Sequence, residues 1–358
     1  MANRNMNAAK TAKKDEFYTQ LADIERELCN YWPHFKGKTV LCNCDDPYES
    51  NFFKYFALRF NQLGLKKLIC TSYNGSPVCG NELLLQFDDA PDRTAYKAVI
   101  TDVPDLNDDG AVDLTDIQML LRNGKGNILT TLQSGDFRSQ ECIEMLKEAD
   151  IVVTNPPFSL FREYISQLVK YGKKFLIIGN MNAITYKEVF PLIMSNRIWL
   201  GYGFNAGNAF FSIPSNMSRN WKSGVYNPNT GLVKFRNCCW FTNLEHNKRH
   251  HPIDLVCRYD PEEYPTYDNY EAIEVGKTAE IPCDYDGVMG VPITFLDKYC
   301  PEQFEIIGIT QRNDDPHKLK KYSKAEYDNA NDLNCRAVLI INGVPKPMYA
   351  RILIKRIS

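Results

Sequence analysis

The stretch that decides the fold is Ala149-Asp150-Ile151-Val152-Val153-Thr154-Asn155-Pro156-Pro157-Phe158. Its unbroken β-branched run, Ile151 to Thr154, predicts a strand that is buried on both faces. The Asn-Pro-Pro-Phe tetrad follows directly, at the carboxyl end of that strand. In open α/β sheets this edge is where ligands bind. The tetrad is therefore a candidate ligand site, and the alternative is a strand that simply ends in a proline turn.

The tetrad also has a definite chemistry. Pro156 and Pro157 fix φ and keep the residue before each of them out of the helical region, so the turn is stiff. Asn155 adds a side-chain carbonyl and Phe158 adds a flat ring. Acceptors beside an aromatic face suit a planar base that carries an exocyclic amine.

This tetrad resembles the catalytic motif of adenine-specific DNA methyltransferases that use S-adenosylmethionine. Further stretches resemble the EcoRI-type modification methylases in particular, and they are Lys14–Gln20, Gly135–Ser139, Leu176–Asn182 and Met289–Leu296. The resemblance runs from the N-terminus to at least Gly308. The tetrad alone is moderately specific, because methylation of protein glutamine uses a similar one, whereas the ordered set is much more specific.

The resemblance implies an α/β protein with a Rossmann-like methyltransferase sheet flanked by helices. Residues 1–203 would form the catalytic, cofactor-binding domain, and residues 204–358 a mixed α+β region that recognises the DNA target. Asn155 Oδ1 and the Pro156 carbonyl would accept the two N–H groups of an adenine amine, and Pro157 would hold the shape of the turn. Phe158 would stack on the adenine once it has left the duplex.

The expected cofactor contacts come from four segments, and they are Phe17, Tyr18, Thr19, Asn43, Asp45, Asp46, Thr71, Asp136 and Phe137. By resemblance, the segment from Phe17 to Thr19 touches S-adenosylmethionine. Asp136 would hold the adenine amine of the cofactor, and Phe137 would pack on its ring.

Several of these expected contacts have alternatives that stay open. Phe17 and Tyr18 could instead staple the following helix to the core, and Thr19 could cap it. The turn after the first expected strand, Lys38 to Cys44, contains no glycine. Asp45 and Asp46 there would attract an amino group and a sulfonium, yet an Asp-Asp-Pro turn is also an ordinary helix start.

An acidic segment has the register of a twelve-residue calcium loop. Its candidate ligands are Asp105, Asn107, Asp109, Asp113 and Asp116, with Gly110 at the sharp turn. This spacing resembles dockerin-type EF-hands and predicts a structural Ca²⁺ site. The alternative is a calcium-free acidic turn, because no incoming helix is expected before the loop.

Composition sets the remaining expectations. The chain has 358 residues and a net charge of −2, so a DNA surface must be a local patch. Lys248 and Arg249, beside two histidines, are the candidate phosphate contacts. The sequence shows no long apolar span and no signal peptide, and its twelve cysteines contain no Cys-x-x-Cys pair. We therefore expect free thiols, no membrane association and a cytoplasmic location.

The C-terminal residues predict a β-hairpin. Arg336 to Ile341 and Met348 to Arg356 are strand-like, and an Asn342-Gly343 turn lies between them.

The function expected from the resemblance is site-specific methylation of the N6 amine of adenine in duplex DNA. The enzyme would work alone or beside a cognate restriction endonuclease, and its oligomeric state is left open. One alternative is methylation of a protein glutamine or of an RNA base. Another is a catalytically silent DNA-binding module, which the glycine-free turn favours and the intact tetrad disfavours.

Overall fold

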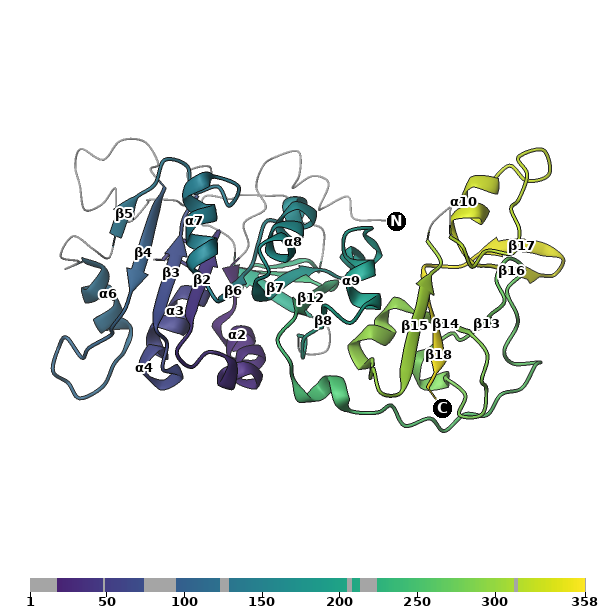
Figure 1. The fold of residues 1–358 in the computed structure, drawn as a ribbon, viewed down its shortest axis with the longest axis horizontal. Coiled ribbons are helices and arrows are strands. Elements are labelled where there is room, and N and C mark those ends of the chain that lie inside the picture. Colours follow the sequence, from purple (N-terminus) through teal and green to yellow (C-terminus); the bar gives the residue numbers. More distant parts are fainter. Residues whose placement is uncertain are drawn as a thin grey trace. The chain divides into compact units, whose positions relative to one another are not determined.

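The structure is a computed structural model that describes residues 18–47, 49–73, 95–122, 129–204, 208–212, 224–311 and 315–357. Phe17 therefore lies outside the described residues. The chain divides into two compact units. Unit 1 comprises Met1–Ala183 and Gly201–Leu244, and unit 2 comprises Ile184–Leu200 and Glu245–Ser358. The protein is of the mixed α/β class and contains several sheets, which confirms the expected class (Figure 1).

Unit 1 contains most of the helices. Its main elements are β1 (Tyr18–Thr19), α2 (Leu21–Leu28), η1 (Cys29–His34), β2 (Thr39–Asn43), α3 (Asn51–Leu58), α4 (Phe60–Leu63), β3 (Lys67–Thr71), β4 (Tyr96–Ile100), α6 (Leu114–Arg122), β5 (Leu129–Thr131), α7 (Gln140–Glu148), β6 (Ile151–Thr154), η2 (Phe158–Leu160), α8 (Phe161–Lys170), β7 (Lys174–Asn180), β9 (Ala209–Ser212), β10 (Tyr226–Asn227), β11 (Leu232–Phe235) and β12 (Cys238–Thr242).

The central sheet of unit 1 has the order β5-β4-β3-β2-β6-β7-β12. Strands β3, β2, β6 and β7 are parallel, whereas β4 and β12 run antiparallel to their neighbours. The predicted strand Ile151–Thr154 is β6, and all of its residues are buried. The chain extends the sheet in opposite directions from its centre. It passes from β2 through α3 to β3 on one side, and from β6 through α8 to β7 on the other. Since such crossovers are right-handed, α3 and α8 cover opposite faces.

Hydroxyl caps fix where two of these helices begin. Ser50 Oγ accepts hydrogen bonds from the backbone N–H groups of Phe52 and Phe53 at the start of α3. Ser139 Oγ accepts one from Cys142 N at the start of α7. Thr19, in contrast, lies in β1 and does not cap α2, whose N-cap is Gln20.

The core of unit 1 joins helix and sheet side chains. It gathers residues of α2, α3 and α6 with those of the central strands and of the smaller sheet β1-β9-β11-β10. Trp240 of β12 is fully buried, stacks on Phe204 and meets Phe52 edge to face. Residues 201–244 thus belong to unit 1 through β12, β9 and β11.

Unit 2 combines short strands with short helical segments. Its elements are α9 (Phe190–Met194), β8 (Trp199–Leu200), η5 (Asn247–His250), β13 (Ile273–Glu274), η6 (Thr278–Glu280), β14 (Met289–Pro292), η7 (Ile293–Lys298), β15 (Phe304–Ile309), α10 (Ala330–Cys335), β16 (Val338–Ile341), β17 (Val344–Pro347) and β18 (Arg351–Arg356). One sheet has the order β13-β14-β18-β15, and β16 pairs with β17 alone.

The predicted C-terminal hairpin is half right. The turn at Asn342-Gly343 is present, with both residues at positive φ. The strand that returns from it is β17, however, and not the segment from Met348 to Arg356. Strand β18 pairs with β14 and β15 instead.

In the described part of the chain, no helix is long and apolar enough to cross a membrane.

Candidate active site

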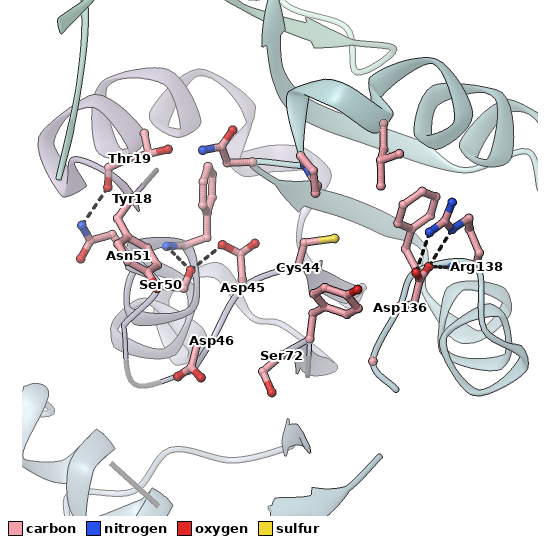
Figure 2. A pocket seen from close by; sticks show the side chains of 17 residues that line it. Tyr18, Thr19, Cys44, Asp45, Asp46, Ser50, Asn51, Ser72, Asp136 and Arg138 are labelled. Atoms are coloured by element: carbon pink, nitrogen blue, oxygen red, sulfur yellow. Dashed lines mark hydrogen bonds and ion pairs between the residues drawn. The ribbon is translucent and has the colours of Figure 1, made fainter. Parts of the chain in front are cut away.

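A pocket of unit 1 lies where several strands of the central sheet end. Segments that follow β2, β3, β5 and β6 meet there, because these strands all direct their carboxyl ends to one edge. The pocket is lined by Tyr18, Thr19, Cys44, Asp45, Asp46, Ser50, Asn51, Phe52, Ser72, Tyr73, Gly135, Asp136, Phe137, Arg138, Asn155, Pro157 and Leu160. Figure 2 shows Asp45 and Asp46 toward one side of the pocket and Asp136 with Arg138 toward the other.

The first acidic side of the pocket is held by short hydrogen bonds. Asp45 is 6% exposed, and its carboxylate accepts hydrogen bonds from Ser50 Oγ at 2.8 Å and from Thr154 Oγ1 at 2.5 Å. Asp46 is 7% exposed and accepts one from Tyr96 OH at 2.7 Å. The two carboxylates therefore have fixed directions, and burial strengthens their attraction for a cationic ligand group.

The opposite side carries an ion pair that the sequence did not predict. Arg138 Nη2 lies 2.8 Å from Asp136 Oδ2, and Arg138 Nε donates to Asp136 Oδ1 at 3.0 Å. Hydrogen bonds from Arg138, opposed by burial, hold the pKa of Asp136 below its usual value. The guanidinium also lies over the Phe137 ring, 5.3 Å from its centroid. Phe137 is buried and packs edge to face on Tyr164 of α8.

The turn that presents Asp136 is locked by close packing. Gly135 has φ +68°, and an added Cβ would lie 1.9 Å from the Ser72 carbonyl oxygen. The Glu141 carboxylate accepts hydrogen bonds from the N–H groups of Gly135, Ser134 and Gln133. Burial alone would raise the pKa of Glu141, but these donors outweigh burial and lower the pKa. The position of Asp136 is thus set by backbone contacts on both sides.

Thr19 enters the pocket wall from β1. Its side chain is 3% exposed, and among the described residues Thr19 Oγ1 has no hydrogen-bond partner. Its backbone carbonyl accepts a hydrogen bond from Asn51 Nδ2 at 2.8 Å, which ties β1 to the start of α3 (Figure 2). A buried hydroxyl that lacks a partner costs free energy, so it marks a place where a ligand can contribute a hydrogen bond.

The Asn-Pro-Pro-Phe tetrad is divided between the pocket wall and the packing behind it. Asn155 and Pro157 line the pocket, whereas Pro156 and Phe158 are described but do not line it. Phe158 is partly buried and packs against the unit 1 core.

Two expected cofactor contacts also lie outside the wall. Asn43 Oδ1 accepts a hydrogen bond from Tyr164 OH. Thr71 is fully buried in β3, opposite Asn43 in the strand register. Neither residue is among those that line the pocket.

The structure adds wall residues that sequence reasoning missed, and they are Cys44, Ser50, Asn51, Phe52, Ser72, Tyr73, Gly135, Arg138 and Leu160. The sequence contains a signal for some of these residues, because they lie at the end of a predicted strand or at the start of the next helix. Arg138 gave no such signal, because an ion pair depends on side-chain placement.

Lys248 and Arg249 lie in unit 2 and already have partners there. Lys248 Nζ pairs with Asp297 at 2.7 Å. Arg249 is 9% exposed, pairs with Glu245 at 3.0 Å and lies over the Trp199 ring at 3.9 Å. The proposed phosphate contacts stay a prediction, and for Arg249 they would require these contacts to be given up.

The acidic loop turns its side-chain oxygens onto its own backbone. Asp105 accepts from Gly110 N at 2.8 Å, and Asp116 accepts from the N–H groups of Leu106 and Asp113 at 2.7 and 2.9 Å. Asn107, Asp109 and Asp113 accept in the same way from residues two positions later. Over the described ranges, no group of three or more His, Cys, Asp or Glu side chains could hold a metal ion. The structure therefore gives no support for the predicted calcium site.

With this geometry in place, comparison with known proteins defines the class. A family model described as adenine-specific methyltransferase EcoRI matches residues 5–357. The chain belongs to this family and is a DNA adenine methyltransferase, which confirms the class of enzyme expected from the sequence. Membership implies the use of S-adenosylmethionine.

Three relatives are similar over most of their length. The chain is 46% identical over 315 residues to the Type II methyltransferase M.EcoRI of Escherichia coli, which covers 85% of this chain and 89% of the relative. It is 36% identical over 366 residues to M.MgeORF184P of Mycoplasma genitalium, covering 98% of each. It is 39% identical over 306 residues to M.MpnI of Mycoplasma pneumoniae, covering 84% of each. No solved structure matches.

Proposed function

We propose that the protein transfers a methyl group from S-adenosylmethionine to the N6 amine of an adenine that has been flipped out of duplex DNA. The observation that carries this proposal is the pocket itself. It joins Asn155 and Pro157, at the end of β6, with buried carboxylates after β2 and an aspartate after β5. The proposed core is a Rossmann-like methyltransferase sheet in which the strand ends supply both substrates' contacts.

The pocket residues fit S-adenosylmethionine, which supplies an activated methyl group on a sulfonium when it is bound. Asp45 and Asp46 would attract the cationic groups of its amino-acid end. Thr19 Oγ1, buried and in need of a partner, would share a hydrogen bond with it. On the opposite side, Asp136 would accept from the adenine amine of the cofactor, with the Phe137 ring beside the base.

Arg138 would control whether the Asp136 carboxylate can accept a hydrogen bond from the cofactor. Its guanidinium and an adenine amine would compete for the same carboxylate oxygens. Arg138 also pairs with Glu163 at 3.0 Å, so it can keep one partner while it releases Asp136.

At the target adenine, the chain's own groups would orient the amine. The lone pair of this amine is delocalised into the ring, which makes it a poor nucleophile. Asn155 Oδ1 and the Pro156 carbonyl would accept its two N–H groups and draw it toward tetrahedral geometry, so that the lone pair is freed. The methylated amine loses a proton readily, so positioning does most of the work and no strong base is needed.

We assign catalysis to unit 1 and target recognition to unit 2, so residues 204–244 join the catalytic part and Ile184–Leu200 leaves it, relative to the division at residue 203 expected from the sequence. The described residues of unit 2 contain two separate sheets that are not part of the catalytic pocket. A cognate restriction endonuclease would make the protein one half of a restriction-modification pair, and the names of the relatives favour such a role.

One assay tests the proposed function directly. The purified protein is incubated with methyl-labelled S-adenosylmethionine and with duplex DNA, RNA or protein extract, and Asn155→Ala serves as the control for each. We expect label in the N6 position of adenine in duplex DNA alone. Label only in RNA or in protein would contradict the proposal, and no label in any substrate would indicate a silent binding module.

The Thr19 hydroxyl gives the first prediction. Thr19→Val keeps the shape of the side chain and removes the buried hydroxyl, so the loss of one hydrogen bond of about 1 kcal/mol should weaken cofactor binding roughly fivefold. Stability without cofactor should stay equal or rise, because an unpaired buried group is removed. Calorimetric titration and thermal melting measure the two effects.

Thr71→Val is the matched control for that experiment. Thr71 Oγ1 is also buried, with no hydrogen-bond partner in the described chain, but Thr71 does not line the pocket. The variant should bind cofactor as the wild type does. If Thr71→Val weakens cofactor binding and Thr19→Val leaves it unchanged, the roles of the two hydroxyls are reversed.

The second prediction concerns Phe158. Phe158→Ala should weaken the binding of the flipped adenine by about 1–3 kcal/mol, the usual worth of a stack between a base and an aromatic ring. Phe158→Trp should restore part of this. The measurement compares duplexes with and without the target base, since an abasic duplex should bind the wild type and Phe158→Ala equally. Equal losses on both duplexes would make Phe158 a packing residue of the unit 1 core.

A further inference from the structure

The hairpin of β16 and β17 in unit 2 ends in an exposed apolar tip. Ile340 is 50% exposed, Ile341 39% and Val344 55%. Its base, in contrast, is buried, since Val338 packs with Tyr322 and Leu333, while Leu339 packs in the cluster around Tyr267. Figure 1 shows the hairpin projecting from the rest of unit 2. Exposed aliphatic side chains at the tip add nothing to the core of unit 2, so their presence there indicates a contact with another molecule.

Both faces of the tip are open. Cross-strand partners in an antiparallel pair share a face, so Ile341 and Val344 lie on one face and Ile340 and Pro345 on the other. A flat docking site would cover only one of them. A two-stranded ribbon with two exposed faces fits a groove whose walls contact both, and the DNA major groove, about 12 Å wide, admits such a ribbon.

The edge of β17 argues against pairing with a strand from another protein. Ile341 and Val344, beside the two-residue turn, form a hydrogen-bonded pair. In the next pair, Ile340 and Pro345, the N–H positions therefore point away from the partner strand. On β17 the outward positions belong to Pro345 and Pro347, which have no N–H. Strand addition along this edge is therefore blocked, as it is at edges protected by proline.

The charge around the hairpin matches a polyanion. From Leu333 to Ser358 the sequence contains five Lys or Arg residues and no Asp or Glu, in a chain whose net charge is −2. Two of the five are already paired, Arg336 with Asp332 and Arg351 with Glu274. Lys346 lies on β17 itself, and Lys321 and Lys324 flank Tyr322, which packs at the hairpin base. These three lysines are exposed and show no ion pair within the described part of unit 2, whereas Lys320 is paired with Asp268.

We propose that the β16–β17 hairpin enters the major groove of the DNA substrate. Ile340, Ile341 and Val344 would make apolar contacts with base edges, such as thymine methyl groups, and the lysines would contact phosphates. The proposal rests on the proposed function, because it takes duplex DNA as the substrate. A second copy of the chain is a poorer fit, since a stable interface needs about 800 Å² from each partner and the tip offers three aliphatic side chains.

The test uses the full-length protein and a fluorescent duplex DNA fragment that the wild type binds. Ile341→Asp/Val344→Asp places two carboxylates at the tip and should weaken binding about tenfold or more. Val256→Asp is the matched control, because Val256 is an 81% exposed aliphatic residue elsewhere in unit 2. Since Asp at the tip could unfold the hairpin, Lys346→Ala provides an independent measurement, and its log-log salt dependence should be shallower by roughly 0.9.

The outcomes separate this proposal from the proposed function. Wild-type affinity in the tip variant, or an unchanged salt slope in Lys346→Ala, overturns the role of the hairpin even if methylation of DNA is confirmed. A tip variant that binds DNA normally but loses a dimer seen by light scattering makes the hairpin a contact between copies. A wild type that binds the fragment through the hairpin but transfers no methyl group overturns only the proposed function.

Discussion

Replacing Asn155 with alanine should lower the turnover of duplex DNA by about a hundredfold, which corresponds to roughly 3 kcal/mol of transition-state stabilisation. The side chain lines the pocket from the end of β6, and the proposed mechanism gives it one of the two acceptors on the target amine. Cofactor binding should change little, because the expected cofactor contacts come from other segments. Single-turnover kinetics with saturating DNA measure the loss at the chemical step.

A second substitution distinguishes this role from packing. Asn155→Asp keeps an acceptor oxygen in the same place and should retain more activity than Asn155→Ala, while a purely steric role would make the two equal. Unchanged turnover in Asn155→Ala would falsify the proposed use of the tetrad. Thermal melting in the absence of ligands is the control for the fold.

The largest expected effect on stability concerns a buried ion pair in unit 2. Glu274 and Arg351 are each 8% exposed, and Arg351 Nη2 lies 2.6 Å from Glu274 Oε1. Burial alone would lower the pKa of Arg351, but the hydrogen bonds and charge of Glu274 raise it. Tyr267 OH donates to the same carboxylate. Glu274→Ala leaves a buried guanidinium unpaired, which costs about 3–5 kcal/mol of unfolding free energy.

Denaturant unfolding of the full chain checks this prediction. Glu305→Ala is the matched control, because Glu305 is an exposed carboxylate on β15 of the same sheet, and it should change stability by less than about 0.5 kcal/mol. The double variant Glu274→Met/Arg351→Met should recover most of the loss, since an apolar pair can replace a buried ion pair. If the single and double variants are equally unstable, the cost comes from lost packing and not from an unpaired charge.

The two effects should also be separable by function. The pocket is lined entirely by residues of unit 1, so cofactor binding should survive in Glu274→Ala at temperatures where methylation of DNA is already lost.

The part of the site that could be predicted from the sequence is the part set by local pattern. The run from Ile151 to Thr154 is apolar and β-branched throughout, so only a buried strand suits it, and the proline turn must then follow at the strand end. Ser139 was predictable as a cap because it directly precedes a helical pattern, and a hydroxyl there satisfies an exposed N–H.

The rest depended on tertiary contacts that leave no periodic signal. Whether Asp136 is held by Arg138, two residues away, is decided by side-chain direction and by the Phe137 ring between them. The strand β17 was missed because its two prolines oppose a strand assignment. Proline is tolerated in β17 because its missing N–H lies on the side that faces away from β16. The predicted calcium site has no support in the structure, because the acidic side chains at this spacing accept hydrogen bonds from their own backbone.

The order in which the two units appear along the chain has a consequence for synthesis and for engineering. The polypeptide passes from unit 1 to unit 2 after Ala183, returns at Gly201 and leaves again after Leu244. On the ribosome, residues 184–200 therefore emerge before β12, and the remaining residues of unit 2 follow only after Leu244. Under the proposed assignment of target recognition to unit 2, a single crossover cannot exchange specificity between relatives, and a chimaera has to transplant Ile184–Leu200 together with everything after Leu244.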